Sequence, residues 1–372
     1  MNSHSKKVLV GLSGGVDSSV ALFLLKKQDY QPIGVSLKFS VWPSKKNICR
    51  ENLCCTNQSF VLARKLCQKL NVPYYIIDCQ KEFEKIVINY FIRELKAGRT
   101  PNPCVVCNQK LRFPKLFKLA KKFGADYVAT GHYARLRREF PISNSQFPNK
   151  SKFSNFQLLK ARDKTKDQTY FLYPLNQKQL AKLIFPLGNL TKEETRKIAE
   201  KEKIQFTKKE SQDFCFVANQ SLIDFLRLEI GEKPGPIYDS KGKKLGIHRG
   251  LHFYTIGQRK GLNLGKRYWV CALDKKRNAL IVTDNENDPA LFKKEVYLKN
   301  YNFISGKSPQ KPIKVLAKCR YRQNLAEATL YPIKNKLLKI VFEKPQKAVT
   351  PGQSCVFYQN DICLGGGVIS EK

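Results

Sequence analysis

Hydrophobic and polar positions follow two alternating periods through the first half of the chain. Four short apolar runs have the length of buried strands: 8–12, 33–37, 74–77 and 127–129. Four segments between them carry apolar residues every three or four positions, as amphipathic helices do: 18–26, 60–70, 83–95 and 113–123. Strands that alternate with helices predict an α/β fold, in which a mostly parallel sheet has helices on both faces.

The pattern changes after about residue 208, where Gly and Pro interrupt short apolar segments. Seven of these segments have the length and regular spacing of strands: 268–273, 280–282, 313–319, 326–330, 337–342, 354–358 and 362–369. Such a series predicts a β-sandwich or a β-barrel. Before it, Thr191 and Glu194 form a capping box that predicts a helix through about Glu202. The polar segment 138–155 predicts a long, disordered surface loop between two strands.

These patterns predict that the chain is divided into three parts. Residues 1–208 form an α/β head, residues 209–275 a small central module rich in β-structure, and residues 276–372 an all-β tail. The chain has 372 residues, which is long for one domain, and its 42% hydrophobic content is sufficient for packed cores. A globally disordered chain is therefore excluded.

The charge of the chain is strongly positive. Sixty-eight Lys and Arg stand against 30 Asp and Glu, which gives a formal net charge of +38. A charge this large favours a polyanionic partner, and we expect nucleic acid rather than an acidic membrane surface. The sequence has neither the ~18 consecutive apolar residues that a membrane span needs nor a signal-peptide core after Met1. We therefore expect a cytoplasmic protein without a membrane partner, whose twelve cysteines are reduced thiols.

A glycine-rich turn joins the first predicted strand to the first predicted helix. It reads GLSGGVDS at 11–18. Glycines let a backbone turn tightly and approach a ligand, and the N–H groups at a helix N-terminus bind anions. The turn lacks both the Walker pattern and the dinucleotide pattern. The alternative is an ordinary turn capped by Ser or Asp, but we favour a phosphate site, because open α/β sheets bind ligands at this edge.

Cysteines in polar, turn-rich segments are the candidates for chemistry. Cys104 and Cys107 lie on the proline-stiffened segment GRTPNPCVVCN at 98–108, just before a predicted helix, and Cys215 begins an apolar run after polar residues. A helix N-terminus and nearby cations favour the thiolate, which is the nucleophile. The alternatives are half of a zinc site or a three-cysteine iron–sulfur site. A second Cys-x-x-Cys pair is missing from the sequence, which disfavours structural zinc.

Histidine gives little support for a protein metal site. His248 and His252 have the spacing of a helical metal pair, but Gly250 between them and the turn-rich context oppose a helix. We expect both rings to be structural, and we expect no metal cage built by the protein.

The motifs resemble those of known enzymes. SGGVDS directly after a first strand resembles the PP-loop ATP pyrophosphatase superfamily, whose members cleave ATP between the α and β phosphates and adenylate a substrate oxygen. With six further motifs in order, the chain resembles the tRNA-specific 2-thiouridylase family over nearly its whole length: GRTPNPCVVCN, ATGHYAR at 129–135, KDQTYFL at 166–172, FCF at 214–216, YTIGQRKGL at 254–262 and RYRQ at 320–323. This resemblance implies an N-terminal PP-loop domain of the adenine nucleotide alpha-hydrolase type, a small central domain carrying the persulfide cysteine, and a C-terminal β-barrel that binds tRNA.

The resemblance also implies a reaction. ATP, with Mg²⁺, adenylates the C2 oxygen of the wobble uridine (position 34) of tRNA, and sulfur from a protein persulfide then replaces that oxygen to give 2-thiouridine, AMP and pyrophosphate. Cys215 matches the persulfide cysteine and Cys107 the catalytic nucleophile, which end as a transient disulfide that a reductant reopens. Direct attack by the persulfide and attack by released hydrosulfide both remain open. The implied partners are tRNA and a persulfide donor protein of a sulfur relay.

Carried over position by position, the family pattern implies two sets of binding residues. The ATP-binding set is Gly11, Leu12, Ser13, Gly14, Gly15, Val16, Asp17, Ser18, Leu37 and Gly131, with Asp17 a contributor to Mg²⁺ binding. The tRNA-binding set, in which the first three contact the target base, is Asn102, Pro103, Cys104, His132, Lys166, Asp167, Gln168, Arg320, Tyr321 and Gln353. The alternatives are an exposed strand pair for Arg320 and Tyr321, and packing or turn roles for His132 and Gln353. The acidic stretch common in the family is replaced by TNQS at 56–59.

Competing functions differ in what they require of the chain. Another PP-loop enzyme, either a small-molecule ligase or an iron–sulfur-dependent tRNA thiolase, would share the loop. The ligase would need neither the two cysteines nor the charge of +38. An RNA-binding protein with a degenerate ATP fold would have a damaged loop, whereas this loop is intact. We therefore expect a tRNA-thiolating enzyme, and an iron–sulfur cluster is not favoured.

Overall fold

The computed structural model describes residues 5–42, 57–139, 155–206, 214–218, 221–333 and 337–371. Most of the expected disordered loop, residues 140–154, lies outside the described residues, as do Thr56 of the TNQS departure and the polar residues 210–213 before Cys215.

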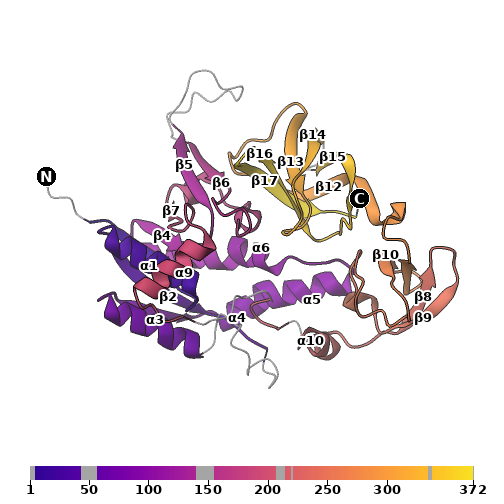
Figure 1. The fold of residues 1–372 in the computed structure, drawn as a ribbon, viewed down its shortest axis with the longest axis horizontal. Helices are drawn as coiled ribbons and strands as arrows, with labels where there is room; N and C mark the ends of the chain where they lie inside the picture. The colour runs from indigo at the N-terminus through magenta and orange to yellow at the C-terminus, as the bar shows by residue number, and fades with distance from the viewer. Residues whose placement is uncertain are drawn as a thin grey trace.

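The head is built on a five-stranded parallel sheet, which confirms the predicted α/β fold (Figure 1). Its order is β3 (Tyr74–Asp78), β2 (Gln31–Lys38), β1 (Lys7–Gly11), β4 (Tyr127–Thr130) and β7 (Leu183–Ile184). Four of these strands coincide with the predicted apolar runs. The fifth, β7, has only two residues, which is too short to produce a hydrophobic period.

Helices cover both faces of this sheet. One face packs against α1 (Val16–Lys27), α3 (Asn57–Lys69) and α9 (Lys192–Lys201), and the capping box of Thr191 and Glu194 is present at the start of α9. Helices on the other face come from residues 80–122: α4 (Gln80–Phe83), α5 (Asn89–Lys96), α6 (Pro103–Cys107) and α7 (Phe113–Lys122). Single π-helical turns, Glu84–Ile88 and Asn108–Arg112, join α4 to α5 and α6 to α7. Cys104 and Cys107 therefore lie near the start of one long helix.

The central module contains α10 (Leu222–Glu229) and a four-stranded sheet. The sheet order is β10 (Trp269–Asp274), β11 (Ala279–Thr283), β8 (Gly235–Asp239) and β9 (Lys244–His248). Strand β11, which the sequence pattern assigned to the tail, pairs with β8 and β10 and so belongs to this central sheet. Further short elements in the described residues are α8 (Gln177–Leu180) and 3₁₀ turns at Thr169–Phe171, Leu251–Phe253 and Pro289–Leu291.

The tail is a closed antiparallel barrel, which decides between the predicted sandwich and barrel. Its strands are β12 (Phe292–Phe303), β13 (Ile313–Lys318), β14 (Ala326–Ile333), β15 (Leu337–Lys347), β16 (Ser354–Gln359) and β17 (Ile362–Ile369), and pairing of β12 with β17 closes the ring. Two strands of the first half, β5 (Arg135–Glu139) and β6 (Asn155–Leu159), extend this sheet, because Leu159 pairs with Ile362 (Figure 1). The head and the barrel are thus joined by a shared sheet.

None of the helices in the described ranges has the length and apolarity to cross a lipid bilayer.

Candidate active site

The loop between β1 and α1 is held in shape by its own serines. The Ser13 backbone N–H donates to Ser18 Oγ at 3.1 Å, and Ser18 Oγ donates to the Gly15 carbonyl at 3.1 Å. Gly14 has a φ of +74°, and a Cβ there would lie 2.4 Å from the Ser59 carbonyl oxygen, so only glycine fits. The N-cap of α1 is Gly15, which has no capping side chain, so the alternative of a turn capped by Ser or Asp is wrong. The first-turn N–H groups of α1 suit a phosphate.

Asp17, in the first turn of α1, is bound by two residues from distant elements. Lys192 Nζ lies 2.7 and 2.8 Å from its two carboxylate oxygens, and Tyr133 Oη donates to Oδ1 at 2.8 Å. The Lys192 side chain is 10% exposed and that of Asp17 is 34% exposed. A Mg²⁺ ion that took Asp17 as a ligand would share the carboxylate with these two residues. Sequence reasoning missed Lys192, because it is 175 residues from Asp17 and lies in no motif.

Gly131 and His132 follow β4 and lie beside this loop. A Cβ on Gly131 would be 2.6 Å from the backbone nitrogen of Ser18, so glycine lets the end of β4 approach the first turn of α1. His132 Nδ1 is 2.8 Å from Thr130 Oγ1, and its ring packs 5.9 Å from the Phe113 ring. Burial, with a smaller contribution from Arg112, lowers the pKa of His132 to about 3. The imidazole is therefore neutral at neutral pH.

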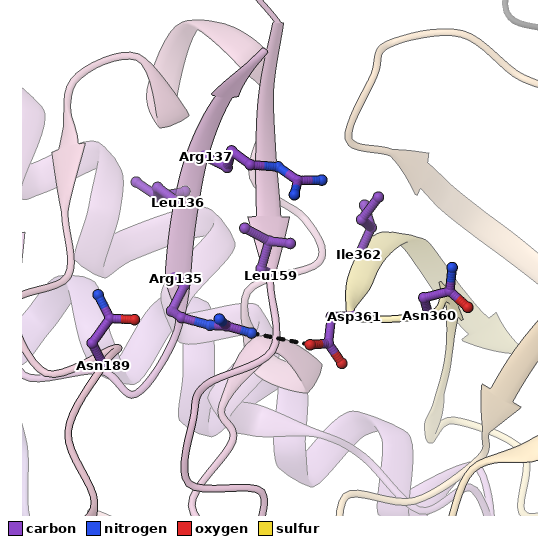
Figure 2. A pocket seen from close by; sticks show the side chains of 8 residues that line it. All are labelled: Arg135, Leu136, Arg137, Leu159, Asn189, Asn360, Asp361 and Ile362. Atoms are coloured by element: carbon purple, nitrogen blue, oxygen red, sulfur yellow. Dashed lines mark hydrogen bonds and ion pairs between the residues drawn. The ribbon is translucent and has the colours of Figure 1, made fainter. Parts of the chain in front are cut away.

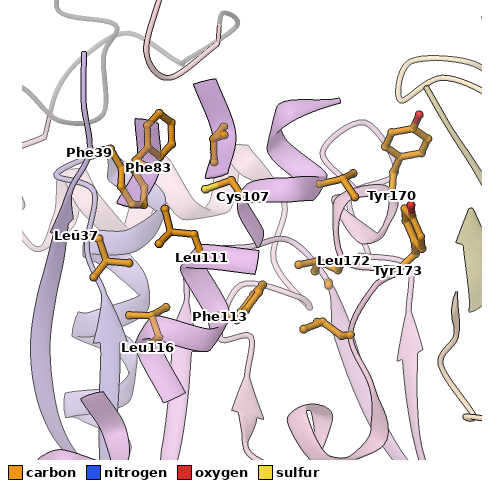
Figure 3. Packing of buried hydrophobic residues seen from close by; sticks show 14 of the residues in the cluster. Leu37, Phe39, Phe83, Cys107, Leu111, Phe113, Leu116, Tyr170, Leu172 and Tyr173 are labelled. Carbon is orange, nitrogen blue, oxygen red and sulfur yellow. The ribbon is translucent and has the colours of Figure 1, made fainter. Parts of the chain in front are cut away.

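Cys107 is buried in a hydrophobic cluster of the head. Its exposure is 3%, and it belongs to the same hydrophobic cluster as Leu37 at the end of β2. Figure 3 shows Cys107 within this cluster, with its sulfur directed toward Phe83 and with Leu111 beside it. Cys104, one helical turn earlier, is exposed. The structure thus separates the two thiols of the Cys-x-x-Cys pair, one into the core and one to solvent.

Aromatic rings hold the segment that carries Cys215. Phe214 and Phe216, on either side of the cysteine, lie 5.0 and 5.3 Å from the Phe91 ring of α5. The Phe216 ring is also 6.0 Å from Phe83, the residue toward which Cys107 points in Figure 3. Cys215 is half-buried and packs against the hydrophobic cluster that contains Cys107. Two cysteines that are distant in sequence therefore reach one cluster.

Two of the predicted tRNA-binding residues of the head, Asp167 and Gln168, form hydrogen bonds within the protein. Asp167 is buried and accepts from the Ala161 backbone N–H at 3.1 Å and from Thr169 Oγ1 at 2.8 Å. Gln168 Oε1 accepts from the Tyr133 backbone N–H at 2.9 Å. Lys166 is half-buried beside them. Asp167 and Gln168 therefore stabilise the conformation of this segment.

Arg320 and Tyr321 follow β13 in a turn. Arg320 donates through Nη2 to the Ile256 carbonyl and to Thr350 Oγ1, both at 2.8 Å, and so links the central module to the barrel. Burial lowers the pKa of Arg320. The Tyr321 ring lies 4.5 Å from the Phe171 ring. Both residues are half-buried and outside any strand, so the alternative of an exposed strand pair is wrong.

A groove of about 520 Å³ lies between the β5–β6 hairpin and the turn that joins β16 to β17 (Figure 2). It is lined by Arg135, Leu136, Arg137, Leu159, Asn189, Asn360, Asp361 and Ile362. Arg135 Nη2 reaches Asp361 Oδ2 across it at 3.1 Å, and Lys160 Nζ is 3.2 Å from Asp361 Oδ1. The lining contains none of the predicted site residues, and its ion pairs connect the head to the barrel.

Metal ligands do not gather in the described part of the chain. There, no three His, Cys, Asp or Glu side chains lie together as a metal site would require, so Cys104, Cys107 and Cys215 do not form a three-ligand set. His248 Nε2 lies 2.9 Å from the Asn278 carbonyl, whereas His252 Nε2 lies 2.9 Å from the Gly231 carbonyl. Each ring thus has its own backbone partner.

Family models match the three parts of the chain in order. Residues 6–219 match the model described as tRNA methyl transferase HUP domain, residues 223–284 its PRC-barrel domain, and residues 293–369 the Aminomethyltransferase beta-barrel domain.

Curated relatives match the chain over nearly its whole length. The chain is 41% identical to tRNA-specific 2-thiouridylase MnmA 1 of Geobacillus kaustophilus, with 98% of this chain and 96% of the relative covered. It is 41% identical to tRNA-specific 2-thiouridylase MnmA of Roseiflexus castenholzii, with 98% and 99% covered. It is 40% identical to the protein of the same name from Vibrio cholerae, with 100% and 98% covered.

Proposed function

The chain belongs to the tRNA-specific 2-thiouridylase family, and from this premise we propose how its residues carry out the reaction. It is a tRNA uridine 2-sulfurtransferase, an enzyme that replaces the C2 oxygen of a tRNA uridine by sulfur. The observation that carries the residue assignments is that Cys107 and Cys215 pack against one cluster, which also contains Leu37 at the carboxyl edge of the sheet.

The glycine loop is the proposed ATP site. Gly11–Ser18 would surround the phosphates, and Leu37 and Gly131 would lie beside the nucleotide. ATP supplies the adenylyl group that makes the C2 oxygen of the wobble uridine a leaving group. The fit rests on the first-turn N–H groups of α1 and on the close approach that Gly14 and Gly131 permit. Mg²⁺ would bind through the phosphates, with a contribution from the Asp17 carboxylate, which Lys192 and Tyr133 also bind.

Sulfur transfer is assigned to the two cysteines. Cys215 would receive a terminal sulfur from a persulfide donor protein. In one route Cys107 attacks the Cys215 sulfur, the S–S bond to the terminal sulfur breaks, and the released hydrosulfide displaces AMP from C2. In the other, the terminal sulfur of the persulfide attacks C2 first and displaces AMP, and Cys107 then attacks the Cys215 sulfur, which breaks the S–S bond and leaves the terminal sulfur on C2. Both routes oxidise the two thiols to a Cys107–Cys215 disulfide, which a dithiol reductant reopens.

We propose tRNA contacts in both the head and the barrel. Asn102, Pro103 and Cys104 would contact the target base, because they precede Cys107 on the same helix start. Lys166, Tyr321 and the basic surface would contact the tRNA around it, the ring of Tyr321 providing a stacking face. Asp167, Gln168, His132 and Arg320 would act by shaping these contacts. We place the reaction in the cytoplasm.

Thiolation of unmodified tRNA tests the assignments. Purified protein is incubated with tRNA, Mg-ATP and a persulfide donor, and the tRNA is digested to nucleosides for mass spectrometry. We expect 2-thiouridine and one AMP per product, and loss of product in Cys107→Ser and in Cys215→Ser. Cys271→Ser, which alters a buried thiol of the central module, is the matched control and should keep activity. Product formed by either of the first two variants would refute the two-cysteine route.

The iron–sulfur alternative predicts a different protein. Anaerobically purified enzyme would then be brown, would contain iron, and would lose thiolation on chelation. Colourless, iron-free protein that thiolates tRNA would leave the two-cysteine route as the mechanism.

A further inference from the structure

The loop that leads to the catalytic helix is tied to α5 at its start. Residues 98–102 connect α5 to α6. Arg99 forms a double hydrogen bond with Glu94 of α5, Nε to Oε2 at 2.7 Å and Nη2 to Oε1 at 3.0 Å. At the other end, Asn102 Oδ1 accepts from the Val105 backbone N–H at 3.4 Å and so caps α6. The conformation of this loop therefore sets where α6 begins.

The C-terminal barrel holds the middle of the same loop. Gln353 Nε2 donates to the carbonyls of Thr100 and Pro101 at 3.1 and 3.0 Å, and the Thr100 N–H donates to the Pro351 carbonyl at 2.9 Å. Gly352, with a φ of +90°, packs closely against the same loop, because a Cβ there would lie 2.8 Å from the Thr100 carbonyl oxygen. A turn more than 240 residues later in the chain is thus shaped to this loop.

The central module meets the loop at the same residue. Thr100 Oγ1 lies 3.1 Å from Thr255 Oγ1. A Cβ on Gly98 would come within 2.7 Å of the Lys275 side chain, so the module also packs against the start of the loop. Head, central module and barrel therefore all contact the five residues before the catalytic helix.

Gln353 binds two backbone carbonyls at once, which few side chains can do. Its amide has two N–H groups, which match the two adjacent carbonyls, and Pro101 and Pro103 offer the loop no N–H groups of their own. Holding both carbonyls fixes the backbone directly before Asn102. The direction of α6, and with it the place of Cys107, follows from that backbone.

We propose that Gln353 is a positioning residue for sulfur transfer, which holds the 98–102 loop from the barrel so that α6 presents Cys107 toward Cys215. This inference rests on the proposed function and gives Gln353 a role other than tRNA contact. It makes the barrel a part of the active-site scaffold as well as a binding surface.

Gln353→Glu tests the proposal, because a carboxylate of the same shape cannot donate to the two carbonyls. We expect kcat for thiolation to fall by about tenfold to a hundredfold, as small displacements of reacting groups do, while the Kd for tRNA stays within about twofold. The matched control is Gln359→Glu, the same change at an exposed barrel position, which should leave both constants unchanged. A loss confined to tRNA affinity would overturn the proposal in favour of a tRNA contact.

Thiol labelling tests the same proposal without the reaction. In the intact enzyme Cys107 is 3% exposed, so its alkylation by iodoacetamide should be slow, and peptide mass spectrometry should show it faster in Gln353→Glu but not in Gln359→Glu. Equal labelling in all three proteins would overturn the inference. Should the wild type fail to thiolate tRNA, the proposed function would fail while this measurement still decides the role of Gln353. If Gln353→Glu does not fold, Gln353→Asn, which is too short to reach the carbonyls, replaces it.

Discussion

Lys192 is part of the candidate site, because it binds Asp17, but it lies in no sequence motif. Its side chain is 10% exposed, and its ammonium binds the carboxylate of Asp17, which belongs to the glycine loop motif. The motif identifies Asp17 from sequence alone. Its partner could not be identified, because an ion pair between α1 and α9 depends on how the helices pack on the sheet and leaves no periodic or local signal.

Lys192→Met should destabilise the protein by about 1–3 kcal/mol, because it leaves a partly buried carboxylate without its cation. Denaturant unfolding measures this cost. The matched control is Lys197→Met in the same helix, whose Glu193 partner is on the surface, with side chains 71% and 76% exposed. That change should cost under about 0.5 kcal/mol. Equal costs for the two variants would show that the Asp17 pair has no special role.

His132 predicts an acid dependence of stability. Its pKa falls from an ordinary 6.5 to about 3 on folding. Below pH 6.5 the unfolded chain therefore binds a proton at His132 that the folded chain does not bind. The contribution of neutral His132 to the free energy of unfolding is complete above pH 6.5 and is lost as the pH falls toward 3. His132→Gln should reduce the loss of unfolding free energy between about pH 7 and about pH 5 by about 1–2 kcal/mol. Parallel pH profiles for the variant and the wild type would contradict this.

At the scale of elements, the segment 214–218 has little regular structure and is positioned by its rings. Phe216 is fully buried and contacts Phe83, Phe91 and Phe225. The FCF motif thus has a physical meaning beyond its cysteine: two aromatic side chains anchor the segment, and the thiol between them is held at the edge of the cluster.

Phe216→Ala should cost about 3–5 kcal/mol of unfolding free energy and should raise the alkylation rate of Cys215 in the folded enzyme. Phe292→Ala, a half-buried phenylalanine at the start of the barrel, is the control and should leave Cys215 labelling unchanged. Unchanged labelling in Phe216→Ala would mean that other contacts position the segment.

Elements were predictable where a clear period or a known motif marked them. The four long strands of the head and most barrel strands follow apolar runs, and the capping box of Thr191 marks the start of α9. Strand β12 was missed because its sequence, FKKEVYLKNYNF, contains six polar residues that interrupt the alternation near both ends. The pairing of Leu159 with Ile362 was also missed, because register between distant strands is a property of the folded chain.

For the site, sequence motifs selected the residues but not their partners. The resemblance pointed to Cys107, Cys215 and Gln353 as separate positions. The shared cluster of the two cysteines, and the hydrogen bonds from Gln353 to Thr100, became visible only with the packing.

At the scale of the whole molecule, the net charge of +38 predicts how tRNA binding responds to salt. Neutralising RNA phosphates releases counterions, so affinity should fall by about a hundredfold or more between about 50 and about 200 mM salt. Titrations at several salt concentrations measure the slope. A change of less than about threefold would mean that the basic surface does not carry the docking.

The strand pairing between Leu159 and Ile362 also sets an order of events during synthesis. The ribosome releases the β5–β6 hairpin early, while its neighbour β17 emerges only after the central module and the other barrel strands. Until then the backbone N–H and C=O groups on the edge of β6 that faces β17 are unpaired. Exposed strand edges of this kind pair with other chains. A nascent or truncated chain that stops before β17 should therefore aggregate through this hairpin, and a chaperone that covers it would protect the unfinished enzyme.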